Sequence, residues 1–216
     1  GGGYGNFKGL GIEKISAHLR SFGFGARLGV DLPGEGRGFL PTPDWKEKNL
    51  GEKWYIGDTY NVSIGQGNLL VTPLQIAAGT SAIANGGALY RPHILGDKNT
   101  QKYILKKDFL SGDDVAVARR GMREAVISGS ARGLGDLMIQ VAGKTGTAQW
   151  KKGEPNHSWF TGFGPYKVIS LPSPVSCDPS FTAVEAESSK NADAIRAATD
   201  LCKRQNAPRQ IVVTIL

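Results

Sequence analysis

Cysteine and methionine are both scarce in this sequence, and each occurs only twice in 216 residues. The two cysteines, Cys177 and Cys202, exclude a disulfide-rich scaffold, which would need several bridges to hold its fold. Long hydrophobic runs are missing as well. No stretch of about 18 apolar residues occurs, and the first residues lack the pattern of a secretory signal peptide. The sequence therefore predicts no membrane-spanning helix.

Histidine is also rare, and its distribution argues against a metal site. His18, His93 and His157 lie far apart, and no metal-ligand spacing links them to the cysteines. We therefore expect neither a metal nor a cofactor. The formal net charge is +7, from 26 Lys and Arg against 19 Asp and Glu. Without a zinc-finger spacing or a ribonucleoprotein motif, this charge indicates only attraction to polyanions, and we expect no nucleic-acid partner.

The composition that remains is that of an ordinary globular protein, with 40% hydrophobic and 21% charged residues. Apolar residues recur at helical spacing over residues 12–22 and predict a first helix. Thr72-Pro73-Leu74-Gln75 is a capping box, with proline at the first helical position, and predicts a helix that continues to about Ala84. Asp113 is predicted to cap a third helix, whose apolar residues share a face over residues 115–126.

Strands are predicted mainly in the second half of the chain. Residues 88–94 predict a short strand, and residues 96–107 predict a surface turn or hairpin. A strand that begins near Ile139 and one at residues 159–163 are predicted to form a hairpin. Residues 210–216 predict a last, apolar strand. The aromatic residues between 45 and 60 are expected either to pack in a core or to line a substrate groove.

The most chemically suggestive stretch lies in the first strand of that hairpin, where Lys144, Thr145, Gly146 and Thr147 follow one another. The lysine supplies positive charge, the two hydroxyls can form hydrogen bonds, and the glycine lets another backbone approach closely. This set suits a ligand that lies along the strand and carries a carboxylate. The residues alone are equally compatible with a strand whose lysine is merely solvated.

The neighbouring residues give this stretch a family context. Gly143-Lys144-Thr145-Gly146-Thr147-Ala148 contains the Lys-Thr-Gly motif of the serine penicillin-binding enzymes, and residues 157–166 resemble the strand that follows it there. Upstream, residues 57–67 and the capping box at residues 72–75 resemble the approach to the active site in class B penicillin-binding proteins. The nearest pattern is that of the transpeptidases of cell-wall elongation. The resemblance extends over roughly residues 9–166.

This resemblance implies an α/β fold of the penicillin-binding-protein/β-lactamase-like transpeptidase type, with an antiparallel sheet flanked by helices. We expect the fold to be incomplete, truncated at both ends. Residues 1–216 are expected to form the C-terminal portion of a transpeptidase domain, with an insertion at residues 167–205 between two sheet strands. In the alternative interpretation, everything after Tyr166 is unrelated sequence.

The resemblance also implies a function, that of a serine D,D-transpeptidase that cross-links peptidoglycan stem peptides at their D-alanyl-D-alanine end and is acylated by β-lactams. Lys144 would be catalytic, and Thr145, Gly146 and Thr147 would bind the substrate. The backbone N–H of Thr147 would supply half of the oxyanion hole. A membrane glycosyltransferase of the elongation machinery is the implied partner. The implied location is the extracytoplasmic side of the cell membrane, with the anchor outside these residues.

The nucleophile for this chemistry is absent from the sequence, because no serine lies in a Ser-x-x-Lys motif. Ser189-Lys190-Asn191 matches the motif Ser-x-Asn, but on the wrong side of Lys-Thr-Gly. Three interpretations remain open. The chain is a piece of a transpeptidase whose other motifs lie upstream, a non-catalytic relative that binds peptidoglycan or partner proteins of the divisome or elongasome, or a basic polyanion-binding protein. Cys177 and Cys202 either pair as a disulfide or stay free thiols.

Overall fold

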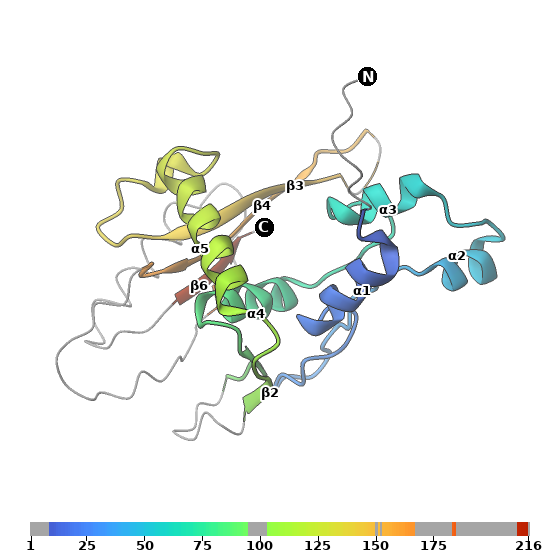
Figure 1. The fold of residues 1–216 in the computed structure, drawn as a ribbon, viewed down its shortest axis with the longest axis horizontal. Helices are drawn as coiled ribbons and strands as arrows, with labels where there is room; N and C mark the ends of the chain where they lie inside the picture. Colours follow the sequence, from blue (N-terminus) through green and yellow to red (C-terminus); the bar gives the residue numbers. More distant parts are fainter. Residues whose placement is uncertain are drawn as a thin grey trace.

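Helix α4, Pro73–Ala84, lies centrally in the computed structural model, which describes residues 9–94, 103–149, 151, 153–166, 183–184 and 211–215. Three shorter helices precede it, and they gather at one end of the molecule (Figure 1). The larger sheet and helix α5 lie at the other end (Figure 1). The three short helices are α1 (Gly11–Ser21), α2 (Pro43–Leu50) and α3 (Ile56–Ser63).

The capping box predicted at the start of α4 is confirmed. The Thr72 hydroxyl accepts a hydrogen bond from the Gln75 backbone N–H at 3.1 Å, and the Gln75 side-chain oxygen accepts one from the Thr72 N–H at 3.0 Å. The helix ends at Ala84, as predicted. Most of its buried residues are small, which allows neighbouring elements to approach closely. These small residues are Ala77, Ala78, Gly79, Ser81, Ala82 and Ala84.

The side chain of Gln75 connects α4 to the segment that follows α1. It is only 1% exposed, and its amide group donates to the carbonyls of Ala26 at 2.8 Å and Arg37 at 2.9 Å, while the Gly23 carbonyl shares one of these two protons at 3.3 Å. Partly buried carbonyls without a donor would cost free energy, so this amide stabilises the docking of the segment on α4.

The larger sheet has the strand order β3-β4-β6-β5. Strands β3 (Ala142–Ala148) and β4 (His157–Gly164) form the predicted antiparallel hairpin, in which Lys144 pairs with Thr161. Strand β6, Ile211–Ile215, confirms the predicted last strand and pairs antiparallel with β4. Strand β5, Ala183–Val184, runs parallel to β6, so the sheet departs from a wholly antiparallel one.

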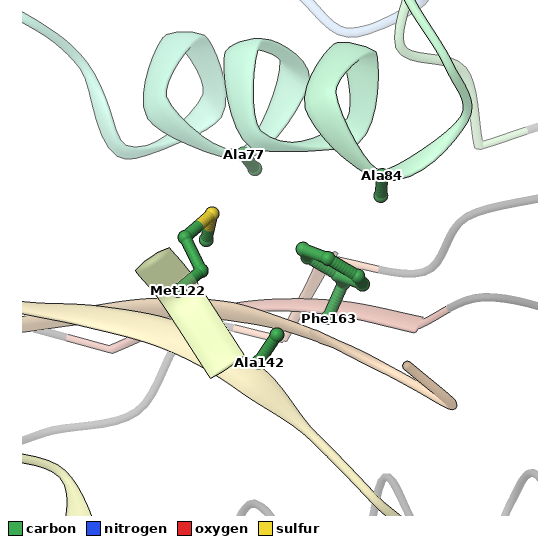
Figure 2. Close-up of a cluster of buried hydrophobic side chains, with 5 residues drawn as sticks. All are labelled: Ala77, Ala84, Met122, Ala142 and Phe163. Atoms are coloured by element: carbon green, nitrogen blue, oxygen red, sulfur yellow. The ribbon is translucent and has the colours of Figure 1, made fainter. Parts of the chain in front are cut away.

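A compact apolar cluster joins α4 and α5 (Gly112–Ile127) to one face of this sheet. Ala77 and Ala84 of α4 face Phe163 and Ala142 of the two hairpin strands, and Met122 of α5 lies between them (Figure 2). Phe163 is 2% exposed and Ala142 is fully buried. In the described part of the chain, both helices therefore cover the same face and support β3 and β4 from that side.

Helix α5 begins two residues earlier than predicted. Its cap is Ser111, whose hydroxyl accepts a hydrogen bond from the Asp114 N–H at 3.1 Å, so the assignment of the cap to Asp113 was wrong. Asp113 instead lies in the first turn, where a carboxylate is favoured by the helix dipole. The predicted apolar face is confirmed, because Val115, Met122 and Val126 are buried.

Two arginines of α5 fasten the helix to the sheet. Arg119 donates to the carbonyls of Ala84 and Tyr166, the latter at 2.8 Å, and its guanidinium lies 5.0 Å from the ring centroid of Phe163. Arg123 donates to the Val141 carbonyl at 2.7 Å, just before β3 begins. Burial lowers the pKa of Arg119 from its ordinary value. The ends of α4 and β4 and the start of β3 are thus held by the same helix.

Helices α2 and α3 were not predicted, because their sequences carry weak apolar periodicity. Thr42 caps α2 by accepting from the Trp45 N–H at 3.2 Å. The four large aromatic residues between 45 and 60 share no ring contact with one another: Trp45 packs on Phe39, while Tyr55 and Tyr60 are exposed. They do not pack as one cluster, while their expected role as the wall of a substrate groove stays a prediction.

The smaller sheet confirms the strand predicted after α4, while residues 96–102 of the predicted turn or hairpin lie outside the described residues. Strand β1, Leu89–Tyr90, pairs antiparallel with β2, Ile104–Lys106.

Several other predictions fall outside the described residues: Cys177, Cys202, Ser189-Lys190-Asn191 and the insertion apart from β5. The division of the chain into a domain with an insertion therefore stays a prediction. In the described part, no helix combines the length and the apolar character needed to cross a membrane.

A buried lysine joins α2 to α3. Lys46 is 7% exposed, and its ammonium lies 2.8 Å from the Asp58 carboxylate and 3.3 Å from that of Glu52. Asp58 also accepts a hydrogen bond from the Tyr55 backbone N–H at 2.7 Å. The hydrogen bond from Lys46, with that from Tyr55, holds the pKa of the Asp58 carboxyl below its usual value. The same contact raises the pKa of Lys46.

Gln75→Leu should lower the free energy of unfolding by about 2–4 kcal/mol, because the partly buried carbonyls of Ala26 and Arg37 lose their donor and the Thr72 N–H loses its acceptor, while the side-chain volume is nearly kept. Gln140→Leu is the matched control: its side chain is exposed, and the substitution should change stability by less than about 0.5 kcal/mol. Urea-induced unfolding measures both. Equal stability of the two variants would show that the amide does not hold the segment in place.

Asp58→Asn should lose stability at neutral pH but not in acid. Because the folded-state pKa of Asp58 lies below the unfolded value of about 3.9, its stabilisation is present above that pH and disappears as the pH falls through the folded-state pKa. The difference in unfolding free energy from wild type should therefore shrink between pH 7 and about pH 3. The exposed Asp136→Asn serves as control, with a small difference at both pH values. A difference for Asp58→Asn that grows in acid would contradict this assignment.

Candidate active site

Strand β3 lies at one end of the described strand order, so one of its edges has no strand partner there. Side chains alternate between the two faces of a strand. Lys144 and Gly146 therefore share the face of Ala142, which α4 and α5 cover farther along, while Thr145 and Thr147 lie on the opposite face. The four residues predicted as a site are brought together at this edge, but on two faces. A ligand can reach all four only by lying along the edge itself.

The side chain of Lys144 is exposed, and the hairpin that carries it is held by a contact with α4. Its ammonium donates a hydrogen bond to the Thr145 carbonyl at 2.7 Å, and it forms no ion pair with any described residue. Across the hairpin it is paired with Thr161, whose hydroxyl lies 2.8 Å from that of Thr80 on α4. The Lys144 ammonium can therefore bind an anion, while the neighbouring strand β4 is hydrogen-bonded to α4 at the position opposite Lys144.

Thr145 has a hydroxyl partner that sequence reasoning missed. Its side-chain oxygen lies 2.6 Å from that of Ser130, in the turn between α5 and β3. No local pattern could have revealed the contact, because it depends on how α5 packs beside β3. Thr147, by contrast, is exposed, and its hydroxyl forms no hydrogen bond within the described residues.

The glycines of the motif serve different purposes. A β-carbon added at Gly143 would overlap the Phe160 ring and lie 2.9 Å from the Thr161 carbonyl, so the ring occupies the space of a side chain there. A β-carbon added at Gly146 would lie 3.3 Å from the β-carbon of Trp159, which is tight but adjustable. Gly146 is exposed, which agrees with the predicted close approach of another backbone.

The chemistry this arrangement offers is recognition of an anion rather than nucleophilic attack. Ser130 is the serine beside the strand, but its partner is a threonine hydroxyl, which does not act as a base. In the described part of the chain, no group of three or more histidine, cysteine or acidic side chains is arranged to hold a metal ion. An ammonium, exposed hydroxyls and an unpaired strand edge together suit a carboxylate-bearing peptide-like ligand.

Comparison with known proteins agrees with these features. Residues 6–171 match the family model of the penicillin binding protein transpeptidase domain. The chain is 36% identical over 178 residues to the peptidoglycan D,D-transpeptidase MrdA of Acinetobacter baumannii, covering 72% of this chain and 26% of the relative. It is 33% identical to MrdA of Haemophilus influenzae, covering 73% of this chain and 28% of the relative.

A solved structure gives the same result. The penicillin-binding protein PBP2 of Helicobacter pylori, in its complex with MreC, superposes with a TM-score of 0.64 at 41% identity. That match covers 72% of this chain and 30% of the PBP2 chain. The chain thus spans roughly a quarter to a third of the length of these relatives. Since the family model matches most of the chain, and the relatives agree with it, the chain belongs to the penicillin-binding protein transpeptidase domain family, in its class B branch and near PBP2.

Proposed function

We propose that this chain is the substrate-recognition part of a peptidoglycan D,D-transpeptidase. The nucleophilic serine of that enzyme would belong to the same protein but lie outside these 216 residues. The observation that carries the proposal is the open edge of β3, with the exposed Lys144 ammonium and the exposed Thr147 hydroxyl on a strand of the family's Lys-Thr-Gly sequence. A stem peptide that ends in D-alanyl-D-alanine has the required form: an extended backbone with a terminal carboxylate. β-Lactams carry the same carboxylate beside a reactive amide.

The reaction divides into two steps. The serine oxygen adds to the carbonyl carbon of the penultimate D-alanine, the terminal D-alanine leaves as a free amine that takes up a proton, and an ester remains. An amine of a neighbouring stem peptide then attacks this ester and releases the serine. Lys144 stabilises negative charge and helps to pass the proton, Thr145 and Thr147 hold the carboxylate, and Gly146 admits the substrate backbone. The Thr147 N–H contributes to the oxyanion hole.

The setting of the activity follows from the same family membership. We propose that the whole protein acts on the extracytoplasmic side of the cell membrane and cooperates with a membrane glycosyltransferase of the elongation machinery. The structure of Helicobacter pylori PBP2 in complex with MreC supports assembly with a protein partner in general, because that related protein binds another protein.

A second candidate function keeps the binding site but not the chemistry. A non-catalytic relative would bind peptidoglycan or partner proteins through the same strand edge, and the absence of Ser-x-x-Lys from this sequence is the observation in its favour. A polyanion-binding role explains the net charge of +7 but not the open Lys-Thr-Gly strand, so it ranks last. Labelling of the natural gene product by a fluorescent penicillin separates the first two functions, because only the catalytic protein forms the covalent ester.

The 216-residue chain on its own should form no covalent, stoichiometric adduct with a fluorescent penicillin. None of its serines has the lysine partner that activates the nucleophile in this family. Gel fluorescence and intact-mass measurement test this directly. A stoichiometric label on the isolated chain would show that a different residue acts as the nucleophile.

In the natural gene product that contains these residues, Lys144→Ala should lower the second-order acylation constant by about 10- to 100-fold. The substitution removes a charge-assisted contact of about 1.5–3 kcal/mol that forms with the reacting ligand. Thr147→Ala should cost less, because its backbone N–H survives. The exposed Lys14→Ala, on α1, is the matched loss of charge and should react at the wild-type rate.

The second-order acylation constant is measured with one β-lactam, by stopped flow or on gels, for wild type and for the three variants Lys144→Ala, Thr147→Ala and Lys14→Ala. Wild-type reactivity of Lys144→Ala would reduce Lys144 to a solvated strand lysine and would overturn the site assignment. Absence of any label on the wild-type product would overturn the transpeptidase proposal and leave the non-catalytic relative as the better explanation.

A further inference from the structure

The hydroxyl pair between Ser130 and Thr145 is a feature of the site that the family motif does not contain. The two side-chain oxygens lie 2.6 Å apart although the residues are separated by 15 positions in the sequence. Ser130 lies in the turn that leads from α5 to β3, and Thr145 lies within the strand at the candidate site. A hydrogen bond this short restricts the rotation of both hydroxyl groups.

The turn that presents Ser130 is held in place by close packing. A β-carbon added at Gly129 would lie 2.8 Å from the Cα of Ala125 and 3.0 Å from its carbonyl oxygen, so glycine permits this contact with the last turn of α5. The Ala131 N–H donates to the same carbonyl at 2.9 Å, and the Ala131 side chain is buried. Ser130 lies between these two anchored residues, so its position relative to α5 is set by the backbone.

Helix α5 is in turn fastened to β3, because Arg123 donates to the Val141 carbonyl at 2.7 Å. The position of the Ser130 hydroxyl beside Thr145 is therefore a consequence of how α5 and β3 pack. The hydroxyl is not carried by a free loop end.

The direction of the hydrogen bonds follows from the ligand. A carboxylate only accepts, so a threonine hydroxyl that binds it must donate its single proton to it. The Thr145 oxygen is then free to accept, and Ser130 is the neighbouring donor. The result is a directed chain from the Ser130 hydroxyl through the Thr145 hydroxyl to the carboxylate, in which the first bond polarises the second.

We propose that Ser130 is a positioning residue of this site: it orients and polarises the Thr145 hydroxyl toward a ligand carboxylate and so contributes to selectivity for carboxylate-bearing substrates. This inference rests on the proposed function. Ser130 touches neither the substrate nor the reacting atoms and acts through Thr145 alone.

The test compares Ser130→Ala with wild type in the natural gene product, with benzylpenicillin and its methyl ester as probes. The acylation constant for the free acid should fall about 2- to 10-fold, the range expected for one hydrogen bond, while that for the ester stays the same. Ser130→Thr keeps the hydroxyl and should restore the rate. Ser128→Ala is the matched control, because this exposed serine in the same turn bonds only within its own helix end, to Glu124.

A double-substitution cycle shows whether Ser130 acts through Thr145. Thr145→Val should lower the rate for the acid, and adding Ser130→Ala to it should cause no further loss. Equal losses for acid and ester, additive effects, or no loss in Ser130→Ala would each overturn the inference. If Lys144→Ala is impaired while Ser130→Ala is not, the proposed function stands and only the role of Ser130 fails. An unlabelled wild-type protein overturns both.

Discussion

The buried amide of Gln75 is the contact on which the arrangement of this chain depends. One side chain caps the start of α4 and donates its two amide protons to carbonyls of the segment that follows α1. Only a neutral amide fits, because a carboxylate has no proton to donate and an apolar side chain leaves the carbonyls unpaired. The contact joins that segment to α4, and the apolar cluster with Ala142 and Phe163 packs α4 on the sheet. The position of the candidate site relative to the first third of the chain follows from these two contacts.

The same helix determines what the sheet presents. Small side chains let α4 lie close to β4, where the hydroxyls of Thr80 and Thr161 meet at 2.8 Å. Thr161 is the partner of Lys144 across the hairpin, so the strand that carries the exposed ammonium is fixed at the residue opposite it. A charge that must meet an anion benefits from such support, because a rigid site loses less entropy when the ligand binds.

Strand β3 combines two kinds of residue at a short distance. Gly143 is buried under the Phe160 ring and is needed for packing, whereas Lys144, Gly146 and Thr147 are exposed at the open edge. Thr145 belongs to both groups, because its hydroxyl is held by Ser130 and yet lies beside the residues that face a ligand. The motif therefore serves the stability of the hairpin as well as recognition. A sequence match alone does not distinguish these two roles.

Local signals in the sequence were sufficient for the capping box of α4, the helices α1 and α5, the β3–β4 hairpin and the apolar strand β6. Each of these follows from the chemistry of a few adjacent residues, such as the mutual caps of Thr72 and Gln75. Helices α2 and α3 were missed, because their apolar periodicity is weak and tertiary contacts, such as the buried Lys46 beside Asp58, stabilise them instead.

The resemblance of the Lys-Thr-Gly stretch identified the family and named Lys144, Thr145, Gly146 and Thr147. It could not reveal that helices cover the face that carries Lys144, that Ser130 bonds to Thr145, or that Phe160 fills the space above Gly143. Those relations depend on the packing of α5 beside β3 and on the register of the hairpin. Such long-range geometry arises only when distant segments bury a common core, so the sequence determined the chemistry of the site and the tertiary structure decided its partners.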